Sequence, residues 1–297
     1  MIEFKEVETL DKQWVQPLLD MASFRGCEYS FGTVYNWRKI FNTRIARVND
    51  FFLSCSQVDG KTGYLFPAGS GDVAPVVEAM MADAKERGQR FSMFSVPEEA
   101  KAKLEILFPG TFHFKETRDS FDYIYDAEKL ATLSGKKLAS KRNHINYFMQ
   151  NNDWSYEDIT EENIDECYKM NQKWCEQNTC SLDESLRQEI CAVKSAFRHF
   201  FELGLKGGLL RSGGEVVAYT MGERLTNDTL LVHIEKAFSE VRGAYPMINK
   251  QFILHNGSDY RYVNREDDVG DEGLRKAKLS YKPAFLLTKY RVTLAED

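Results

Sequence analysis

Charged and polar side chains in the last third of the chain follow predicted strands or precede predicted helices. Glu235 lies at the end of the apolar run 229–236, and Asn264, Arg265 and Glu266 lie at the end of the next strand-like run. In α/β folds, ligands bind at the carboxyl ends of strands and at helix N-termini, where backbone groups are unpaired. These four residues are therefore the first candidates for chemistry.

A carboxylate at position 235 is suited to general-base catalysis. It would take a proton from an amine acceptor before that amine attacks a thioester or ester carbonyl. If the two strands are neighbours, Asn264, Arg265 and Glu266 would line the same crevice and bind the acceptor, because the guanidinium presents a bidentate fork to a carboxylate or phosphate. The alternative is structural, with Glu235 and the adjacent Lys236 forming an ion pair.

The segment 135–150 is basic and contains no acidic residue. A helix over this segment would place Lys137, Lys141 and His144 on one side. Together with Arg142, these side chains would suit the phosphates of a nucleotide cofactor or of a tRNA acceptor stem. The alternative is a solvated helix face.

Arg242 and Gly243 stand just before a predicted helix over 245–255. A glycine there lets backbone N–H groups approach a pyrophosphate, and the helix N-terminus adds positive potential. A simple turn is the alternative. Arg275 and Lys278, on a predicted helix over 272–280, would add cationic side chains for the phosphates of a donor.

The composition favours a soluble globular protein. The 297 residues are 43% hydrophobic and 28% charged, with a net charge of −6, which argues against a general nucleic-acid binder. There is no apolar run of roughly 18 residues and no signal-peptide core, so we expect a cytoplasmic protein without a transmembrane segment. Six cysteines without a CxxC pair favour reduced thiols and no metal site. Hydrolase, P-loop and Rossmann motifs are absent.

Strand and helix patterns recur in nearly the same order in two halves. The first half predicts β-α-α-β-β-α-β-α-β, with a hairpin of 44–56 and 63–66 turning at Asp59-Gly60, and one long strand or two over 111–125. The second half predicts β-α-α-β-β-β-α-β-α-β and ends in a strand over 285–292. We expect an α/β (α+β) protein of two domains, 1–134 and 135–297, each a mixed central sheet flanked by helices. The basic linking helix 135–150 begins the second domain, and only this domain carries charged strand ends.

The second order is similar to the GNAT (general N-acetyltransferase) fold, and a tandem pair resembles the Fem-type aminoacyltransferases. Several motifs also resemble the uncharacterised family related to the C-terminal domain of phosphatidylglycerol lysyltransferase. They are GKKLASKRNHIN (135–146), EKA (235–237), RGAY (242–245), NREDDVG (264–270) and EGLRKAKLSYKP (272–283), with Glu28-Tyr-Ser-Phe followed by Trp37 in the first half.

The resemblance implies two tandem GNAT-like domains and an activity, because the best-known members of the family aminoacylate lipids with aminoacyl-tRNA. In GNAT enzymes the loop that corresponds to 242–245 binds the pyrophosphate of the donor. A tyrosine near the last helix often returns a proton to the leaving thiolate or 3′-hydroxyl. By this resemblance, Tyr281 would be the general acid.

We therefore expect an acyl- or aminoacyl-transferase. The acyl group would pass from acyl-CoA or aminoacyl-tRNA, as a co-substrate and not a tightly bound cofactor, to an amine or hydroxyl of a small molecule, a peptide or a lipid head group. The acceptor would attack directly, assisted by Glu235, without a covalent enzyme intermediate. Two alternatives stay open: a non-catalytic ligand-binding protein on the same fold, and a peripheral membrane protein that modifies lipid head groups.

Overall fold

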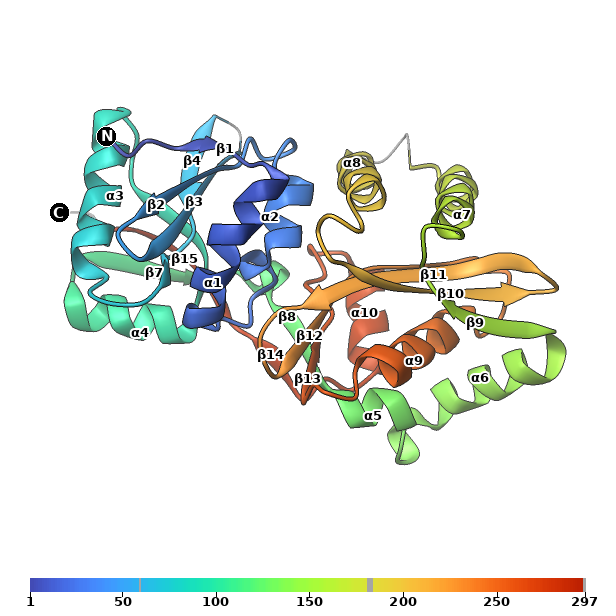
Figure 1. Ribbon diagram of the computed structural model, residues 1–297. Helices are drawn as coiled ribbons and strands as arrows, with labels where there is room; N and C mark the ends of the chain where they lie inside the picture. The colour runs from blue at the N-terminus through green and yellow to red at the C-terminus, as the bar shows by residue number, and fades with distance from the viewer. Residues whose placement is uncertain (59, 181–183, 296–297) are drawn as a thin grey trace. The chain divides into compact units, whose positions relative to one another are not determined.

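The chain folds into two compact units (Figure 1), and the computed structural model describes residues 1–58, 60–180 and 184–295. The first unit runs from Met1 to Asp122 and also takes in Asp267–Asp271 and the chain from Leu286 onward. The second unit consists of Tyr123–Glu266 and Glu272–Phe285. This division differs from the expected boundary at residue 134, because residues 123–134 belong to the second unit and the last strand belongs to the first.

The first unit contains a mixed sheet and four α-helices among its described residues. Its elements are β1 (Lys5–Glu6), α1 (Lys12–Ala22), α2 (Phe31–Trp37), β2 (Arg44–Val48), β3 (Phe51–Val58), β4 (Lys61–Tyr64), β5 (Ala68–Gly69), α3 (Ala74–Glu86), β6 (Ser92–Pro97), α4 (Glu98–Leu107), β7 (Phe112–Glu116) and β15 (Lys289–Leu294). The strand order is β1-β2-β3-β4-β6-β15-β7, with β5 beside β3. Strands β4 and β6 are parallel.

The second unit contains a larger set of helices around a seven-stranded sheet. Its elements are β8 (Asp122–Asp126), α5 (Ala127–Thr132), α6 (Ala139–Asn151), β9 (Trp154–Asp158), α7 (Ile164–Gln177), α8 (Glu184–Arg198), β10 (Lys206–Ser212), β11 (Glu215–Arg224), β12 (Thr229–Ala237), α9 (Ala244–Asn256), β13 (Tyr262–Asn264), α10 (Glu272–Ser280) and β14 (Phe285–Leu287). The strand order is β14-β8-β13-β12-β11-β10-β9, and β12 and β13 are parallel.

Each sheet includes one strand from another part of the chain. β8 follows β7 in sequence but lies between β13 and β14, and β15 follows β14 but lies between β6 and β7. When these two strands are set aside, β1-β2-β3-β4-β6-β7 and β9-β10-β11-β12-β13-β14 are the same strand order. The patterns at 111–125 and 285–292 therefore each cover two strands of different sheets. The expected fold class, two α/β units with mixed sheets and flanking helices, is confirmed.

The expected hairpin in the first unit is a three-stranded arrangement. Its first arm, 44–56, divides into β2 and β3, which pair antiparallel and turn at Asn49 and Asp50. Asn49 has a φ of 53°, which asparagine tolerates better than most residues and which suits a tight hairpin turn. Strand β3 then pairs with β4, while Asp59 of the predicted Asp59-Gly60 turn lies outside the described residues.

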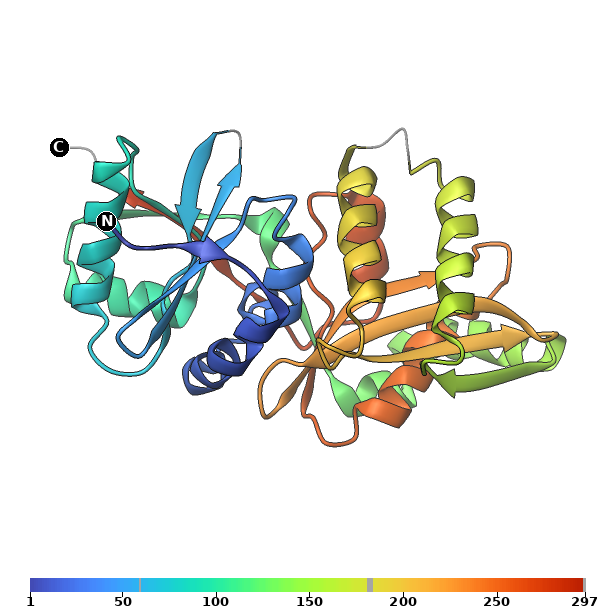
Figure 2. The same ribbon diagram turned by 45° about the horizontal axis from the view of Figure 1, so that its top comes forward.

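Helices cover both faces of the second sheet. Figure 2 shows α7 and α8 on one face and α9 on the other. The apolar side chains of α9 explain its position, because Met247, Ile248, Phe252 and Ile253 are all 0–1% exposed and their removal from water stabilises the packing. None of the helices in the described part of the chain is both long and apolar enough to cross a bilayer.

Candidate functional site

The parallel pairing of β12 with β13 ends where β13 ends, and β12 extends beyond it. The two strands pair at three positions, the last being Leu231 with Asn264, and β12 then continues to Ala237. The register between β11 and β12 shifts at His233, and such a β-bulge bends the strand that carries it. In open α/β sheets, ligands bind in the crevice outside the carboxyl ends of the strands.

Glu235 lies on the part of β12 beyond its pairing with β13 and is held by two donors. Its Oε1 accepts a hydrogen bond of 2.8 Å from Arg265 Nη2, and its Oε2 accepts one of 2.8 Å from Asn249 Nδ2 on α9. The Glu235 and Arg265 side chains are 12% and 10% exposed, so the ion pair is largely shielded from water. The expected proximity of β12 to the end of β13 is therefore observed.

Two buried polar atoms beside this pair have no hydrogen-bond partner among the described residues. They are Arg265 Nη1, a donor, and Asn249 Oδ1, an acceptor. Buried polar groups are nearly always satisfied by protein, water or ligand. A ligand that offers a hydrogen-bond acceptor to Arg265 Nη1 and a donor to Asn249 Oδ1 would satisfy both atoms.

Aromatic and cationic side chains surround the Glu235–Arg265 pair. The guanidinium carbon of Arg265 lies 4.6 Å from the ring centroid of Tyr281, and Lys141 Nζ lies 4.0 Å from the same centroid. Tyr125 makes an edge contact with Tyr281 at 6.4 Å between centroids. We call Glu235, Arg265, Asn249, Tyr281 and Lys141 the Glu235 cluster.

Burial perturbs the titration of the cluster. It raises the pKa of the Tyr281 phenol, although the Arg265 charge opposes this shift. Burial lowers the pKa of the Lys141 ammonium to about 8; Arg265 acts in the same direction and Glu235 opposes it. Burial disfavours the charged form of Arg265, but Glu235, Tyr125 and Tyr281 together outweigh it and the pKa of the guanidinium rises. At neutral pH the cluster therefore holds a charged Arg265 and a neutral Tyr281.

Sequence patterns alone did not indicate Asn249 or Tyr125 as members of this region. Asn249 is a polar residue within the apolar part of α9 and is 1% exposed, so a buried amide in an apolar helix face was the available signal. The Tyr125 hydroxyl donates to the Lys278 carbonyl at 2.7 Å and ties β8 to α10.

The other two predicted acceptor-binding residues lie in a different network. The Asn264 side chain is fully buried, and its Oδ1 accepts a hydrogen bond of 2.7 Å from the Glu266 backbone N–H. The Glu266 carboxylate contacts His233 Nδ1 at 2.9 Å. Of the three consecutive residues, only Arg265 joins Glu235.

The predicted phosphate-binding residues are distributed over several elements. Arg142 donates to the carbonyls of Leu133 and Gly135, and so it closes the turn after α5. Lys278 Nζ donates to the Arg265 carbonyl at 2.6 Å, while Arg242 stacks on the Tyr147 ring of α6 at 4.3 Å. Each of these three cations therefore has a structural contact.

The expected basic helix over 135–150 starts later than predicted. Lys137 lies in a 3₁₀ turn, Lys136–Leu138, and α6 begins at Ala139. Lys137 is exposed and Arg275, on α10, is half-buried. The structure thus places Lys141 in the Glu235 cluster but does not extend one continuous basic helix face from Lys137.

Gly243 is required by the packing of α9 against α6. Its φ is 92°, and a Cβ atom there would lie 2.2 Å from the His144 carbonyl oxygen and 2.9 Å from Phe148 Cβ. The glycine therefore permits a close approach of two backbones. Its predicted contact with a pyrophosphate stays a prediction.

Gly243→Ala should lower the free energy of unfolding by about 2–3 kcal/mol, because it adds a steric clash to an unfavourable backbone conformation. Gly214→Ala is the matched control, since Gly214 has a φ of 85° and nothing within 4 Å of its Cβ position. The control should lose only about 1 kcal/mol. Urea denaturation measures both, and equal losses would contradict the packing role of Gly243.

Lys236 does not pair with Glu235. Its ammonium lies 2.8 Å and 2.9 Å from the two carboxylate oxygens of Glu189 and 4.0 Å from the centroid of the Trp174 ring. Successive side chains of a strand point to opposite faces, so Glu235 points towards α9 and Lys236 towards α7 and α8. The structural alternative, an ion pair between these two neighbours, is excluded for this reason.

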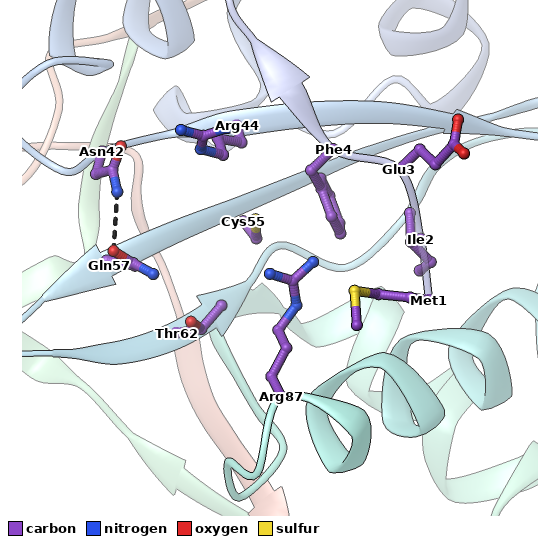
Figure 3. A pocket seen from close by; sticks show the side chains of 10 residues that line it. All are labelled: Met1, Ile2, Glu3, Phe4, Asn42, Arg44, Cys55, Gln57, Thr62 and Arg87. Atoms are coloured by element: carbon purple, nitrogen blue, oxygen red, sulfur yellow. Dashed lines mark hydrogen bonds between the residues drawn. The ribbon is translucent and has the colours of Figure 1, made fainter.

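A separate cavity of about 520 Å³ lies in the first unit (Figure 3). It is lined by Met1, Ile2, Glu3, Phe4, Asn42, Arg44, Cys55, Gln57, Thr62 and Arg87. One of its charged groups, the Arg87 guanidinium, is already paired with the buried Asp83 carboxylate at 2.7 Å. No residue of the Glu235 cluster lines this cavity. We treat the cluster as the candidate site because it holds a buried donor and a buried acceptor without partners among the described residues.

Comparisons with known proteins agree with the fold of both units. A crystal structure of a conserved protein of unknown function from Bacteroides thetaiotaomicron is 38% identical, covers 99% of this chain and 100% of its own, and superposes with a TM-score of 0.96. The C-terminal domain of a protein described as a lysylphosphatidylglycerol synthetase from Agrobacterium fabrum has a TM-score of 0.69 at 12% identity, covering 96% and 93% of the two chains. The second likeness shows a shared fold.

Sequence comparison assigns the family. An uncharacterised protein from Mycoplasmoides gallisepticum is 29% identical over 177 residues, which are 58% of this chain and 56% of that protein. This chain thus spans little more than half the length of that relative. The family model for the C-terminal region of phosphatidylglycerol lysyltransferase matches residues 20–293. The motifs of the second unit and the signature around Glu28 and Trp37 lie within this match, and the chain belongs to the phosphatidylglycerol lysyltransferase C-terminal family.

Proposed function

We propose that this protein is an acyl- or aminoacyl-transferase whose reaction centre is the Glu235 cluster. The observation that carries the proposal is the shielded Glu235–Arg265 pair, which leaves Arg265 Nη1 without a partner beside Tyr281. Membership of the phosphatidylglycerol lysyltransferase C-terminal family supports the same reaction class. The donor is an acyl-CoA or an aminoacyl-tRNA, and the acceptor is an amine or hydroxyl.

Arg265 and Tyr281 have complementary parts in this mechanism. The acceptor attacks the donor carbonyl directly, so that a C–N or C–O bond forms and negative charge develops on the carbonyl oxygen. Arg265 Nη1–H stabilises that charge, because a fixed donor in a shielded site loses little energy to reorganisation. The C–S or C–O bond of the donor then breaks, and the leaving group takes a proton from the Tyr281 hydroxyl, which is neutral because burial raises its pKa.

The start of α9 and the surrounding cations are proposed to hold the phosphates of the donor. α9 is a 13-residue helix that begins just after Gly243, so its N-terminal N–H groups favour an anion. Arg242, Arg275 and Lys137 would add positive charge, whereas Arg142 and Lys278 already donate to backbone carbonyls. The lipid head group that the family description suggests as acceptor is one class among amines and hydroxyls to be tested.

Purified wild-type protein should transfer a radiolabelled acyl group from acetyl-CoA or from a bulk mixture of aminoacyl-tRNAs to an amine, or to a hydroxyl of phosphatidylglycerol vesicles. Tyr281→Phe and Arg265→Lys should each lower kcat/KM by about 100-fold, the usual cost of losing one proton donor or one oxyanion donor. Tyr260→Phe is the control, since Tyr260 lies outside the cluster, and it should keep the wild-type rate.

The outcomes separate the two functions expected from the sequence. Folded wild-type protein that neither binds nor transfers from either donor would refute the proposal. Tight binding of a donor in calorimetry, without transfer to any acceptor, would instead identify a non-catalytic ligand-binding protein. Retention of full activity by Tyr281→Phe and Arg265→Lys would move the reaction centre away from the Glu235 cluster.

A further inference from the structure

The Glu235 carboxylate is poorly placed to accept a proton. Both of its oxygens are occupied, Oε1 by Arg265 and Oε2 by Asn249, each at 2.8 Å. Protonation would also leave the Arg265 guanidinium buried without a counter-charge, and the loss of one partner from a shielded ion pair is costly. Glu235 therefore positions Arg265 and Asn249 rather than taking up the proton of the acceptor.

Lys141 is the group of the cluster that is available for this proton. Its amine lies over the Tyr281 ring at 4.0 Å and is half-buried. Among the described residues, neither a hydrogen bond nor an ion pair holds it, in contrast to Lys278, which donates to the Arg265 carbonyl. Lys141 is therefore free to exchange a proton at the centre of the cluster.

We propose that the Lys141 amine, rather than the Glu235 carboxylate, accepts the proton of the attacking acceptor. This inference rests on the transferase function proposed above. The acceptor N–H or O–H gives its proton to neutral Lys141 as its lone pair forms the new bond to the acyl carbon. Tyr281 protonates the departing sulfur or oxygen, and the Lys141 ammonium then returns a proton to the Tyr281 phenolate. Both residues end as they began, and the net change is an exchange of acyl group for hydrogen between donor and acceptor.

The charges around Lys141 favour its neutral form near physiological pH. Arg265, after β13, repels the ammonium, and Glu235 on β12 attracts it. The Tyr281 phenol, just after α10, lies against it and is itself in contact with Tyr125 of β8. Its own helix carries Arg142 and His144. Burial and Arg265 together lower the pKa to about 8, so a larger fraction is neutral at pH 7–8 than for an ordinary lysine with a pKa of about 10.4.

Lys141→Arg tests the inference, because arginine keeps the positive charge and cannot become neutral in this pH range. We expect kcat/KM to fall by about 100-fold or more. Wild-type kcat/KM should rise with pH to a plateau above about 8, and the variant should lack this rise. Lys141→Ala should be equally slow and should regain activity when a small tertiary amine such as trimethylamine is added, which can accept a proton but cannot form an amide with the acyl group. Lys129→Ala, at an exposed position of α5, is the control and should keep both the rate and the pH profile.

A measurement without substrate complements the kinetics. Trace acetylation of the folded protein at several pH values, followed by peptide mass spectrometry, should show half-maximal reactivity of Lys141 near pH 8. A wild-type enzyme that transfers while Lys141→Arg keeps its rate within threefold and its pH profile would overturn this inference alone. A wild-type protein without transfer would overturn the proposed function, and with it this inference.

Discussion

Lys289→Met should lower the free energy of unfolding by about 3–5 kcal/mol, because it leaves two shielded carboxylates without their cation. The Lys289 side chain is fully buried in β15, and its ammonium lies 2.7 Å from Asp122 Oδ1 and 2.8 Å from the Glu28 carboxylate. Burial alone would lower the pKa of Lys289, but Asp122, Cys27 and Glu28 outweigh it and raise the pKa well above its usual value.

The geometry around Lys289 explains why its loss should be severe. The ligand atoms of Cys27, Glu28 and Asp122 lie within 4.8 Å of one another, and Lys289 Nζ also contacts Cys27 Sγ at 3.5 Å. The ammonium thus occupies the position between three groups that could otherwise hold a metal ion. It also joins residues that are up to 262 positions apart in the chain, so it fixes β15 within the sheet of the first unit.

Urea denaturation should be combined with hydrogen exchange of peptides from β15 and β6, which assigns the loss to the first unit. Lys115→Met on β7 is a matched control, because Lys115 is exposed and lies opposite Arg291 in the antiparallel ladder of β7 and β15. This variant should change stability by less than about 0.5 kcal/mol. Adding Asp122→Asn to Lys289→Met should recover part of the loss, since it removes one uncompensated charge. A loss below about 1 kcal/mol for Lys289→Met would contradict the role of the buried ammonium.

Local patterns indicated that Glu235 and Arg265 would lie close together, whereas Tyr281 follows only from the family resemblance. Glu235 and Arg265 were predicted from their positions at the ends of two strands, and those strands are parallel neighbours in the sheet. The alternation of side chains along a strand was already enough to separate Glu235 from Lys236, because adjacent residues face opposite sides. Applied to the sequence, this rule would have excluded their ion pair.

The parts that could not be predicted depend on contacts between distant segments. The patterns at 111–125 and 285–292 indicate strands but contain no information about which sheet each half joins. The sheet that β8 or β15 joins depends on pairing with strands that are far away in the sequence. The sequence analysis missed Asn249, Tyr125 and the ion pairs of Lys289 for the same reason. The role of each depends on contacts with side chains or backbone groups of other elements.

The positive φ of Asn49 and the packing of Gly243 show a different limit. The Asn-Asp turn was present in the sequence, but the stronger Asp-Gly signal ten residues later was taken for the whole hairpin. The predicted contact of Gly243 with a pyrophosphate stays a prediction, and its observed neighbours, His144 and Phe148, lie on a helix about 100 residues earlier. A glycine before a helix is thus explained by backbone packing, and any role in donor binding would be additional.

His233→Gln should make the second unit less stable at pH 6 by about 3–5 kcal/mol, because two carboxylates would lose the cation between them. His233 Nε2 contacts Glu223 at 3.0 Å and Nδ1 contacts Glu266 at 2.9 Å, and the imidazole side chain is 9% exposed. Burial would lower the pKa of His233, but the hydrogen bonds and charges of Glu223 and Glu266 outweigh it and raise the pKa to about 10. The ring is therefore an imidazolium at the β-bulge of β12.

The sign of the pH dependence follows from this raised pKa. The stabilisation is fully present below the unfolded pKa of about 6.5 and is lost as the pH rises towards about 10 in the wild type. The difference in unfolding free energy between wild type and His233→Gln should therefore shrink steadily from pH 6 to pH 10. NMR titration of the His233 ring protons should show no midpoint below about pH 9. His113→Gln, at an exposed position of β7, should change neither property, and a His233 midpoint near 6.5 would show that the two carboxylates do not hold an imidazolium.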